Sequence, residues 1–129
     1  MIKKLLLIIP ILTCLGFAEM INVPDDYSNI QDAIDASEDG DSIFVDPGVY
    51  FENINFIGKA IVLSSKYLLE NDSLLIGVTI IDAQNEGSVV TFDNGENNNS
   101  ILQGFTLQNG NGNDEDPDNN GSFYTYGGG

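Results

Sequence analysis

A short apolar strand stands between turn residues at positions 40–50, where the sequence reads GDSIFVDPGVY. Ile43 and Val45 occupy alternate positions in this stretch, so both side chains can point to the same face of a strand and pack into a core. Pro47 and Gly48 then favour a turn. A unit of this kind, a few strand-like residues followed by turn residues, recurs along the chain and decides the predicted fold.

Further strand-like segments follow at residues 53–56, 60–63, 78–81, 88–92 and 101–107. In the first of these, Ile54 and Phe56 stand at alternate positions and are also predicted to point inward. Turn-forming residues, chiefly Asn, Asp and Gly, separate them. Two or three such segments with their turns amount to one coil of a parallel β-helix, in which each strand pairs with its counterpart one turn above or below. The alternative is a sandwich of antiparallel hairpins. Segments this short, and the lack of two-residue Asn-Gly turns between adjacent strands, count against that alternative.

An amphipathic helix is predicted between a first strand at residues 20–23 and the repeated units. Ser28 is a suitable N-cap, and Gln31 stands three residues later, as a capping box requires. Gly40 is expected to end the helix. The apolar residues that share one face of it are Ile30, Ala33 and Ile34. The predicted role of this helix is to cover the open end of the strand stack as an N-terminal cap.

Residues 1–18 have the pattern of a secretory signal peptide. Two lysines precede an uncharged apolar run at residues 5–15 that is too short to span a bilayer, and Gly16 and Ala18 supply the small residues that cleavage requires. We predict cleavage after Ala18, which places the mature segment outside the cell, either secreted or at the outer cell surface, with no transmembrane span. The alternative is a lipoprotein in which Cys14 is the acylated first residue.

The mature segment, residues 19–129, is strongly acidic. All 20 Asp and Glu residues lie in it, whereas Lys59 and Lys66 are its only basic residues, so its net charge is −18. Nucleic acid is therefore excluded as a partner, because binding phosphates needs a basic face. Acidic polysaccharides would also be repelled unless divalent cations bridge the charges. The mature segment has no cysteine, so its stability must come from packing and backbone hydrogen bonds rather than from disulfides.

The stretches that carry a family resemblance are residues 28–36, 40–50, 52–54, 79–82 and 102–110. Together they resemble the opening of proteins with the pectin-lyase-like right-handed parallel β-helix fold. This resemblance implies an all-β solenoid with a short N-terminal capping α-helix. Residues 19–129 would then be the cap and the first coils of a domain that continues beyond the chain end.

The last residues separate two groups within that fold. In pectin methylesterases, the strand similar to residues 104–109 is followed by a segment that supplies glutamine, aspartate and arginine to the active site. Here an insert rich in Asn, Asp and Gly leads into Tyr124-Thr125-Tyr126 and the triplet 127–129. This ending is more similar to the repeats of bacterial surface and polymorphic outer-membrane-type β-helix proteins. The resemblance thus implies a structural or binding module whose partner is a polysaccharide or another cell-surface component.

The alternative is the N-terminal part of a carbohydrate-active enzyme of the pectin lyase or pectin methylesterase type, with its active site downstream. The reactive side chains favour the module. Residues 19–129 contain no His, Arg or Cys, so imidazole bases and thiolate nucleophiles are absent from them. Carboxylates remain, notably Asp25, Asp26, Asp41 and Asp46. The sequence does not indicate that any two of these face each other across a cleft, as glycosidases require, so no catalytic or cofactor-binding residue is predicted.

One acidic cluster has the spacing of calcium ligands. Asp114, Asp116 and Asp118 alternate as do the oxygen ligands at the start of an EF-hand loop. The match fails further along, because Asn119 stands where the loop needs glycine and Thr125 where it needs a bidentate glutamate. The failed match favours an exposed, solvated insertion between two strands. The alternative is a calcium site with these three aspartates as ligands, and calcium is the one cofactor that the sequence suggests.

Overall fold

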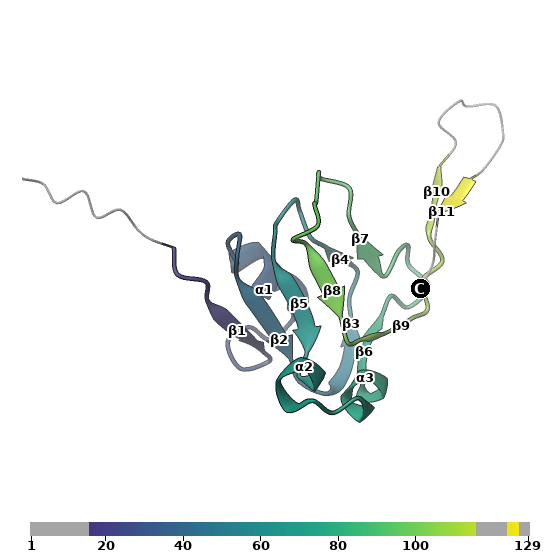
Figure 1. Ribbon diagram of the computed structural model, residues 1–129. Coiled ribbons are helices and arrows are strands. Elements are labelled where there is room, and N and C mark those ends of the chain that lie inside the picture. The colour runs from purple at the N-terminus through teal and green to yellow at the C-terminus, as the bar shows by residue number, and fades with distance from the viewer. Residues whose placement is uncertain (1–15, 116–123, 127–129) are drawn as a thin grey trace, which may run out of the picture.

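Short parallel strands and three short helices make up the fold in the computed structural model, which describes residues 16–115 and 124–126 (Figure 1). The strands form three small parallel sheets and one antiparallel pair. Within the described part of the chain, no helix is long and apolar enough to cross a membrane.

The largest sheet has four parallel strands. Its strands, in order, are β1 (Met20–Val23), β2 (Ser42–Val45), β5 (Val62–Ser65) and β8 (Ile101–Gln103). The register places Ile21, Ile43, Leu63 and Leu102 in one row across the sheet. The first three of these side chains are buried and the fourth packs against them, so the row forms one wall of the core.

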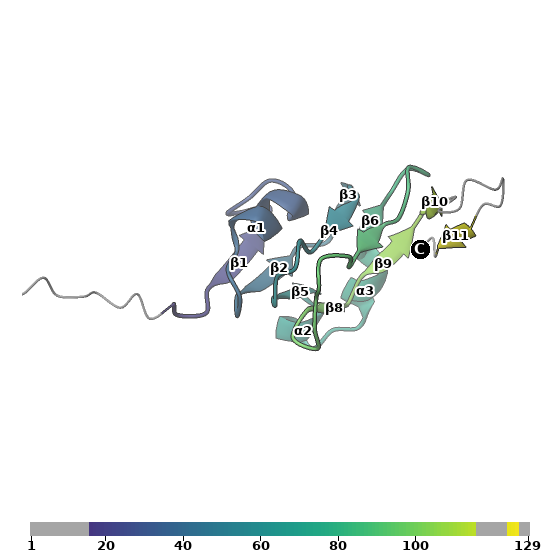
Figure 2. The same cartoon turned by 90° about the horizontal axis from the view of Figure 1, so that it is seen from above.

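Two smaller parallel sheets and an antiparallel pair complete the strand content. The three-stranded sheet consists of β3 (Gly48–Phe51), β6 (Thr79–Asp82) and β9 (Thr106–Gln108). The two-stranded parallel sheet consists of β4 (Ile54–Asn55) and β7 (Val90–Thr91). The antiparallel pair consists of β10 (Asn113–Glu115) and β11 (Tyr124–Tyr126). Figure 2 shows β1 toward the N-terminal end of the molecule and the β10–β11 pair at the opposite end.

One apolar core joins the parallel sheets to the first helix, α1 (Ile30–Ala36). Its buried members are Ile21, Val23, Ile30, Ala33, Ile34, Ile43, Val45, Ile54, Phe56, Ile61, Leu63, Ile81, Ala83 and Val89. Each large aliphatic side chain in this set stabilises the fold by about 1.5–3 kcal/mol relative to an exposed one. The predicted inward pairs of strands β2 and β4, Ile43 with Val45 and Ile54 with Phe56, are confirmed because all four are buried.

Helix α1 begins one residue later than predicted and ends earlier. Asn29 is the N-cap rather than Ser28, and its side-chain oxygen accepts a hydrogen bond from the backbone N–H of Asp32 at 2.8 Å. The last helical residue is Ala36 rather than a residue next to Gly40, because the residue after Ala36 adopts an extended backbone. The predicted apolar face is nevertheless confirmed, since Ile30, Ala33 and Ile34 have no exposed surface.

Polar side chains from later in the chain hold both ends of α1. The Glu52 carboxylate accepts hydrogen bonds from the backbone N–H groups of Ile30 and Gln31, both at 2.9 Å. The Gln31 side chain pairs with the backbone of Asn55, donating to its carbonyl at 3.0 Å and accepting from its N–H at 2.8 Å. The Lys59 ammonium donates to three backbone carbonyls at the other end of the helix, at 2.5–2.7 Å. The predicted capping box is therefore wrong, because Gln31 bonds to strand β4 instead.

Two short helices, α2 (Tyr67–Glu70) and α3 (Leu74–Val78), fill the connection between β5 and β6 and were not predicted. Figure 1 shows both at the lower end of the molecule. The hydroxyls of Thr79 and Thr106 donate to backbone carbonyls of α3 at 2.7 and 2.9 Å, which ties this helix to the three-stranded sheet. The exposed apolar side chains of these helices are Leu68, Leu69, Leu74 and Val78.

The predicted right-handed parallel β-helix is wrong. The strands are two to four residues long and belong to separate small sheets, which do not coil into a solenoid. The helical connection at residues 67–78 also separates strands that a regular repeat would place close in sequence. The apolar spacing indicated short strands, but it does not determine how the strands group into sheets. The antiparallel sandwich differs from the structure as well, since three of the four sheets are parallel.

Two predicted segments have different boundaries in the structure. Gly48, predicted as a turn residue, begins strand β3. The segment predicted as one strand at residues 101–107 is two strands, β8 and β9, because Gly104 has a φ of +79°. Glycine adopts this left-handed conformation without steric cost, so the chain turns there from the four-stranded to the three-stranded sheet.

Candidate functional site

Polar side chains gather where the strands of the four-stranded sheet end. Asp46 follows β2, Lys66 and Tyr67 follow β5, and Gln103 is the last residue of β8. These residues come together because the carboxyl ends of parallel strands meet at one edge of a sheet, the edge at which open parallel sheets commonly bind ligands. Tyr50 of the neighbouring strand β3 completes the group. We call Asp46, Tyr50, Lys66, Tyr67 and Gln103 the corner cluster.

An ion pair forms the centre of the corner cluster. The Lys66 ammonium contacts Oδ1 of Asp46, and both side chains are partly exposed, at 25% and 32%. The hydrogen bond to Asp46 raises the pKa of Lys66 above its ordinary value, and the nearby carboxylates of Asp25 and Glu70 act in the same direction. Partial desolvation opposes this effect without reversing it. Lys66 therefore stays protonated and presents a fixed cation at the surface.

Tyr50 holds the backbone beside this ion pair. Its hydroxyl donates a hydrogen bond to the backbone carbonyl of Asp46 at 2.9 Å. Burial raises the pKa of the Tyr50 phenol, and the carboxylates of Asp46 and Glu52 raise it further. The hydroxyl thus keeps its proton and its hydrogen bond over a wide pH range. This bond fixes the position from which the Asp46 side chain extends.

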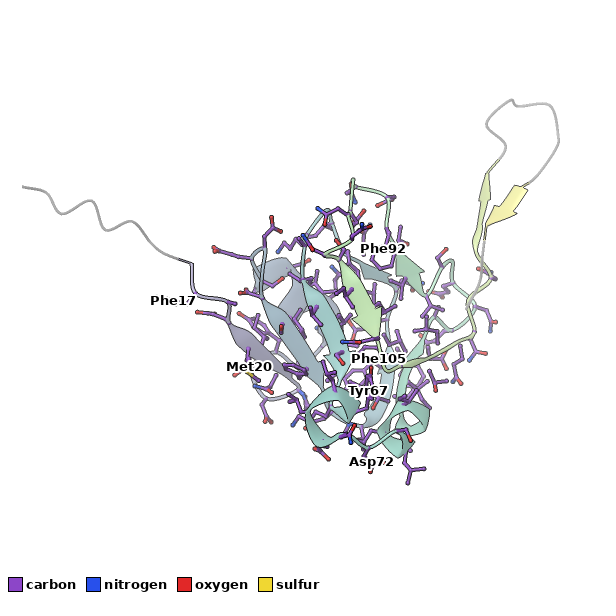
Figure 3. The ribbon with its side chains drawn as sticks, in the orientation of Figure 1. Phe17, Met20, Tyr67, Asp72, Phe92 and Phe105 are labelled. Carbon is purple, nitrogen blue, oxygen red and sulfur yellow. The ribbon has the colours of Figure 1, made fainter. Side chains whose placement is uncertain are left out.

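Tyr67 lies directly over the backbone of Gly104, next to the end of β8 (Figure 3). A Cβ atom added to Gly104 would come within 2.1 Å of Cδ1 and 2.4 Å of Cε1 of the Tyr67 ring. The Tyr67 hydroxyl lies 3.2 Å from Oε1 of Gln103, to which it donates a hydrogen bond. The glycine at position 104 therefore lets the ring approach the chain and fixes both Tyr67 and Gln103.

The corner cluster combines the groups needed to bind a polar ligand. Lys66 provides a hydrogen-bond donor, Asp46 an acceptor, and Gln103 an amide with both capacities. Both members of the ion pair reach solvent, so a ligand can bind them without opening the core. The sequence pointed to Asp46 only as a turn residue. The signal available for Lys66 was its rarity, as one of two basic residues in a strongly acidic segment.

A second polar group, around Asp82, has a structural role. Its carboxylate accepts hydrogen bonds from the side chains of Gln108 and Asn109, at 2.8 and 2.9 Å, and from the backbone N–H of Gln84 at 2.8 Å. The bond from Gln108 is the largest cause that lowers the pKa of Asp82 below its ordinary value, followed by those from Gln84 and Asn109. These bonds join the ends of β6 and β9 and use the acceptor positions of the carboxylate.

Two of the other carboxylates that the sequence singled out, Asp26 and Asp41, are bound to the protein's own backbone. Asp26 accepts a hydrogen bond from the backbone N–H of Asn22 at 2.7 Å, on the outer edge of β1. Asp41 accepts from the backbone N–H groups of Glu19 and Glu38, both at 2.8 Å. The structure does not bring these two aspartates together as a catalytic pair, since each closes a local turn or edge.

The predicted calcium ligands lie mostly outside the described residues. Asp114 is in strand β10, whereas Asp116 and Asp118 fall in the part of the chain that the structure does not describe. The calcium site at these residues stays a prediction. Elsewhere in residues 16–115 and 124–126, no group of three or more His, Cys, Asp or Glu side chains is placed to hold a metal ion.

An open depression of about 430 Å³ lies away from the corner cluster, beside β1 and α1. The residues that line it are Glu19, Met20, Ile21, Asp26, Tyr27 and Ala36. We place the candidate site at the corner cluster instead, because there, within the described residues, a cation, a carboxylate and an amide lie at the ends of three neighbouring strands.

No protein-family model, no curated protein and no solved structure matches this chain. The resemblance to pectin-lyase-like proteins therefore rests on the sequence motifs alone.

Proposed function

We propose that this protein is a secreted or cell-surface binding module that recognises neutral carbohydrate through the corner cluster. One observation carries the proposal: Asp46, Lys66 and Gln103 lie at the ends of three neighbouring parallel strands, where Lys66 pairs with Asp46 and Gln103 bonds to Tyr67, the residue after Lys66. The signal-peptide pattern of residues 1–18 supports a location outside the cell.

The hydrogen-bonding groups of the cluster suit the hydroxyl groups of a sugar. Each hydroxyl is both a donor and an acceptor, so neighbouring hydroxyls can bind Lys66 and Asp46 at the same time. Gln103 can donate its amide N–H to the ligand while its oxygen accepts from Tyr67. Charge-assisted hydrogen bonds of this kind contribute about 1.5–3 kcal/mol each, which is enough for weak but specific binding.

The charge of the chain favours a neutral ligand over an acidic one. The mature segment carries a net charge of −18, and its two lysines are both engaged, Lys59 at the end of α1 and Lys66 with Asp46. An acidic polysaccharide would therefore meet a surface of the same sign. A neutral oligosaccharide avoids this repulsion.

The protonation of Lys66 favours binding over covalent catalysis. A lysine acts as a nucleophile or a base only after losing its proton, and enzymes achieve this by lowering its pKa. Here the hydrogen bond to Asp46 raises the pKa of Lys66. The cluster is thus arranged to hold a ligand rather than to attack it.

Calorimetric titration with a neutral and an acidic oligosaccharide of equal length tests this function. We expect millimolar or tighter binding of a neutral oligosaccharide and no binding of the acidic one. Lys66→Met should weaken that binding about tenfold or more, since it removes a charge-assisted hydrogen bond worth about 1.5–3 kcal/mol. Gln103→Ala should weaken it about two- to tenfold, since a neutral hydrogen bond is worth about 0.5–1.5 kcal/mol.

The matched control is Ser73→Ala, an exposed change in the same helical connection whose side chain makes no cap hydrogen bond. It should leave the affinity within about twofold. Neutral oligosaccharides that bind none of the proteins would contradict the proposal, as would binding that survives both Lys66→Met and Gln103→Ala unchanged.

A further inference from the structure

The backbone at the predicted start of the mature chain leads directly to a buried carboxylate. Residues 16–19 are exposed, yet the backbone N–H of Glu19 donates a hydrogen bond to Oδ1 of Asp41 at 2.8 Å. Asp41 is only 6% exposed. Its second oxygen accepts from the backbone N–H of Glu38 at 2.8 Å. Among the described residues, Asp41 thus has two amide donors and no cation beside it.

A buried carboxylate without a countercharge is costly, because the loss of hydration is only partly replaced by neutral hydrogen bonds. The atom that already donates to Asp41 is the nitrogen that would become the N-terminus after cleavage at Ala18. An ammonium group at the same position would supply the missing charge and a stronger, charge-assisted hydrogen bond.

We propose that the bond between Ala18 and Glu19 is a processing site, and that Asp41 is the binding site for the α-ammonium group that processing releases at Glu19. Water adds across the peptide bond in a reaction catalysed by a signal peptidase. The carbonyl carbon of Ala18 takes the hydroxide oxygen and leaves as a carboxylate. The nitrogen of Glu19 takes the remaining protons and becomes an ammonium group, so atoms and charges balance.

Strand pairing holds the new N-terminus in place. The carbonyl of Glu19 accepts a hydrogen bond from the backbone N–H of Ser42 at 2.9 Å, and β1 follows immediately in register with β2. The ammonium group is therefore positioned before it forms. Cleavage one residue earlier or later would move the charge by about 3.3 Å along the strand, out of hydrogen-bond reach of Asp41. The site is thus selective for a chain that begins at Glu19.

The carboxylates around this N-terminus favour the ammonium form, and they outnumber the one cation held nearby, Lys59, which bonds to the carbonyl of Ser37. Asp41 lies opposite it, Glu38 and Asp39 belong to the same turn, and the side chain of Glu19 is also acidic. The pKa of the α-amino group should therefore lie above the ordinary range of about 7.7–8.0. A group whose pKa is raised by folding stabilises the protein fully below its unfolded pKa, and this contribution is lost as the pH rises through the folded pKa.

Three forms of the chain test the proposal: one that begins at Glu19 with a free amino group, the same chain with that group acetylated, and one that begins at Ala18. At pH 6 the free form should melt about 4 °C or more above both others. Asp41→Asn should abolish the difference between the free and acetylated forms. Asp39→Asn is the matched control, because this neighbouring carboxylate bonds to the backbone of Ala60 instead and the difference should persist.

Two further measurements keep the test decisive if Asp41→Asn does not fold. Nuclear magnetic resonance titration of the free form gives the pKa of the α-amino group directly, and an ordinary value would overturn the proposed ion pair. Sequencing the N-terminus of the exported protein gives the processing site, and any start other than Glu19 would overturn that part. Equal melting temperatures of the free and acetylated forms would also refute the role of Asp41. None of these outcomes depends on carbohydrate binding.

Discussion

Replacing Gly104 with alanine should destabilise the protein by about 3 kcal/mol, through two separate costs. The φ of +79° at this position costs a residue with a Cβ atom about 1–2 kcal/mol. The new methyl group would also lie 2.1 Å from the Tyr67 ring and 2.6 Å from Oγ of Ser65, so the ring must move. Overpacking of this kind costs about 1–3 kcal/mol.

A matched glycine separates the two costs. Gly95 has a φ of +83°, but a Cβ atom there would meet no heavy atom within 4 Å. Gly95→Ala should therefore show the backbone cost alone, about 1 kcal/mol. Urea unfolding followed by circular dichroism gives both free energies, provided that the slope of the transition is unchanged.

A double-mutant cycle with Tyr67→Ala then isolates the contact with the ring. Once the ring is removed, the close approach to Oγ of Ser65 remains, so Gly104→Ala should still cost more than Gly95→Ala but about 1 kcal/mol less than when the ring is present, which is the coupling free energy between positions 67 and 104. Carbohydrate affinity should fall in Gly104→Ala, since Gln103 loses the hydrogen bond from Tyr67 that orients it. The proposed packing of Tyr67 would be refuted if the destabilisations by Gly104→Ala and Tyr67→Ala were additive in the double variant. It would also be refuted if Gly104→Ala were as stable as Gly95→Ala.

Three further predictions concern the core, the start of α1 and Asp82. Ile34→Asp puts an unpaired charge where a side chain has no exposed surface, so unfolding free energy should drop by about 4 kcal/mol and light scattering should detect association; a monodisperse protein with unchanged melting would contradict this. Glu52→Gln weakens the two hydrogen bonds to the first turn of α1 and should lower the free energy of unfolding by about 1 kcal/mol. Hydrogen exchange measured on this variant should speed up more in α1 than in β6. Asp82 has a lowered pKa in the folded protein. Its contribution to folding stability is therefore present above its ordinary pKa of 3.8 and is lost as the pH falls through its pKa in the folded state. Asp82→Asn should therefore lower the urea midpoint more at pH 6 than at pH 2.5, and an equal effect at both values would disprove the linkage.

The apolar periodicity predicted where most strands lie, but not how they assemble. Ile43 with Val45 and Ile54 with Phe56 were placed correctly because alternation depends on the backbone alone, whatever sheet the strand joins. The grouping into separate sheets depends on turns such as the one at Gly104, where sequence does not report the sign of φ. The solenoid was inferred from regular spacing, and that inference assumed regular connections.

The helices α2 and α3 and the corner cluster were missed for related reasons. Residues 67–78 contain no helical period long enough to detect and no side-chain N-cap, since each helix is a single turn or little more. Asp46 and Lys66 are twenty residues apart in sequence and meet only because β2 and β5 are parallel and in register. A contact that depends on register between two strands leaves no local pattern.

The clamps on α1 also determine the order in which the chain can fold. A helix of seven residues is far below the length of about 12–15 at which an isolated helix becomes stable in water. The side chains that hold its two ends come from Glu52 and Lys59, more than twenty residues further along. As the chain emerges from its N-terminus, residues 30–36 therefore stay unfolded until position 59 has followed. The helix cannot act as a local nucleus, and its residues remain unfolded until the chain has emerged past β4 to position 59.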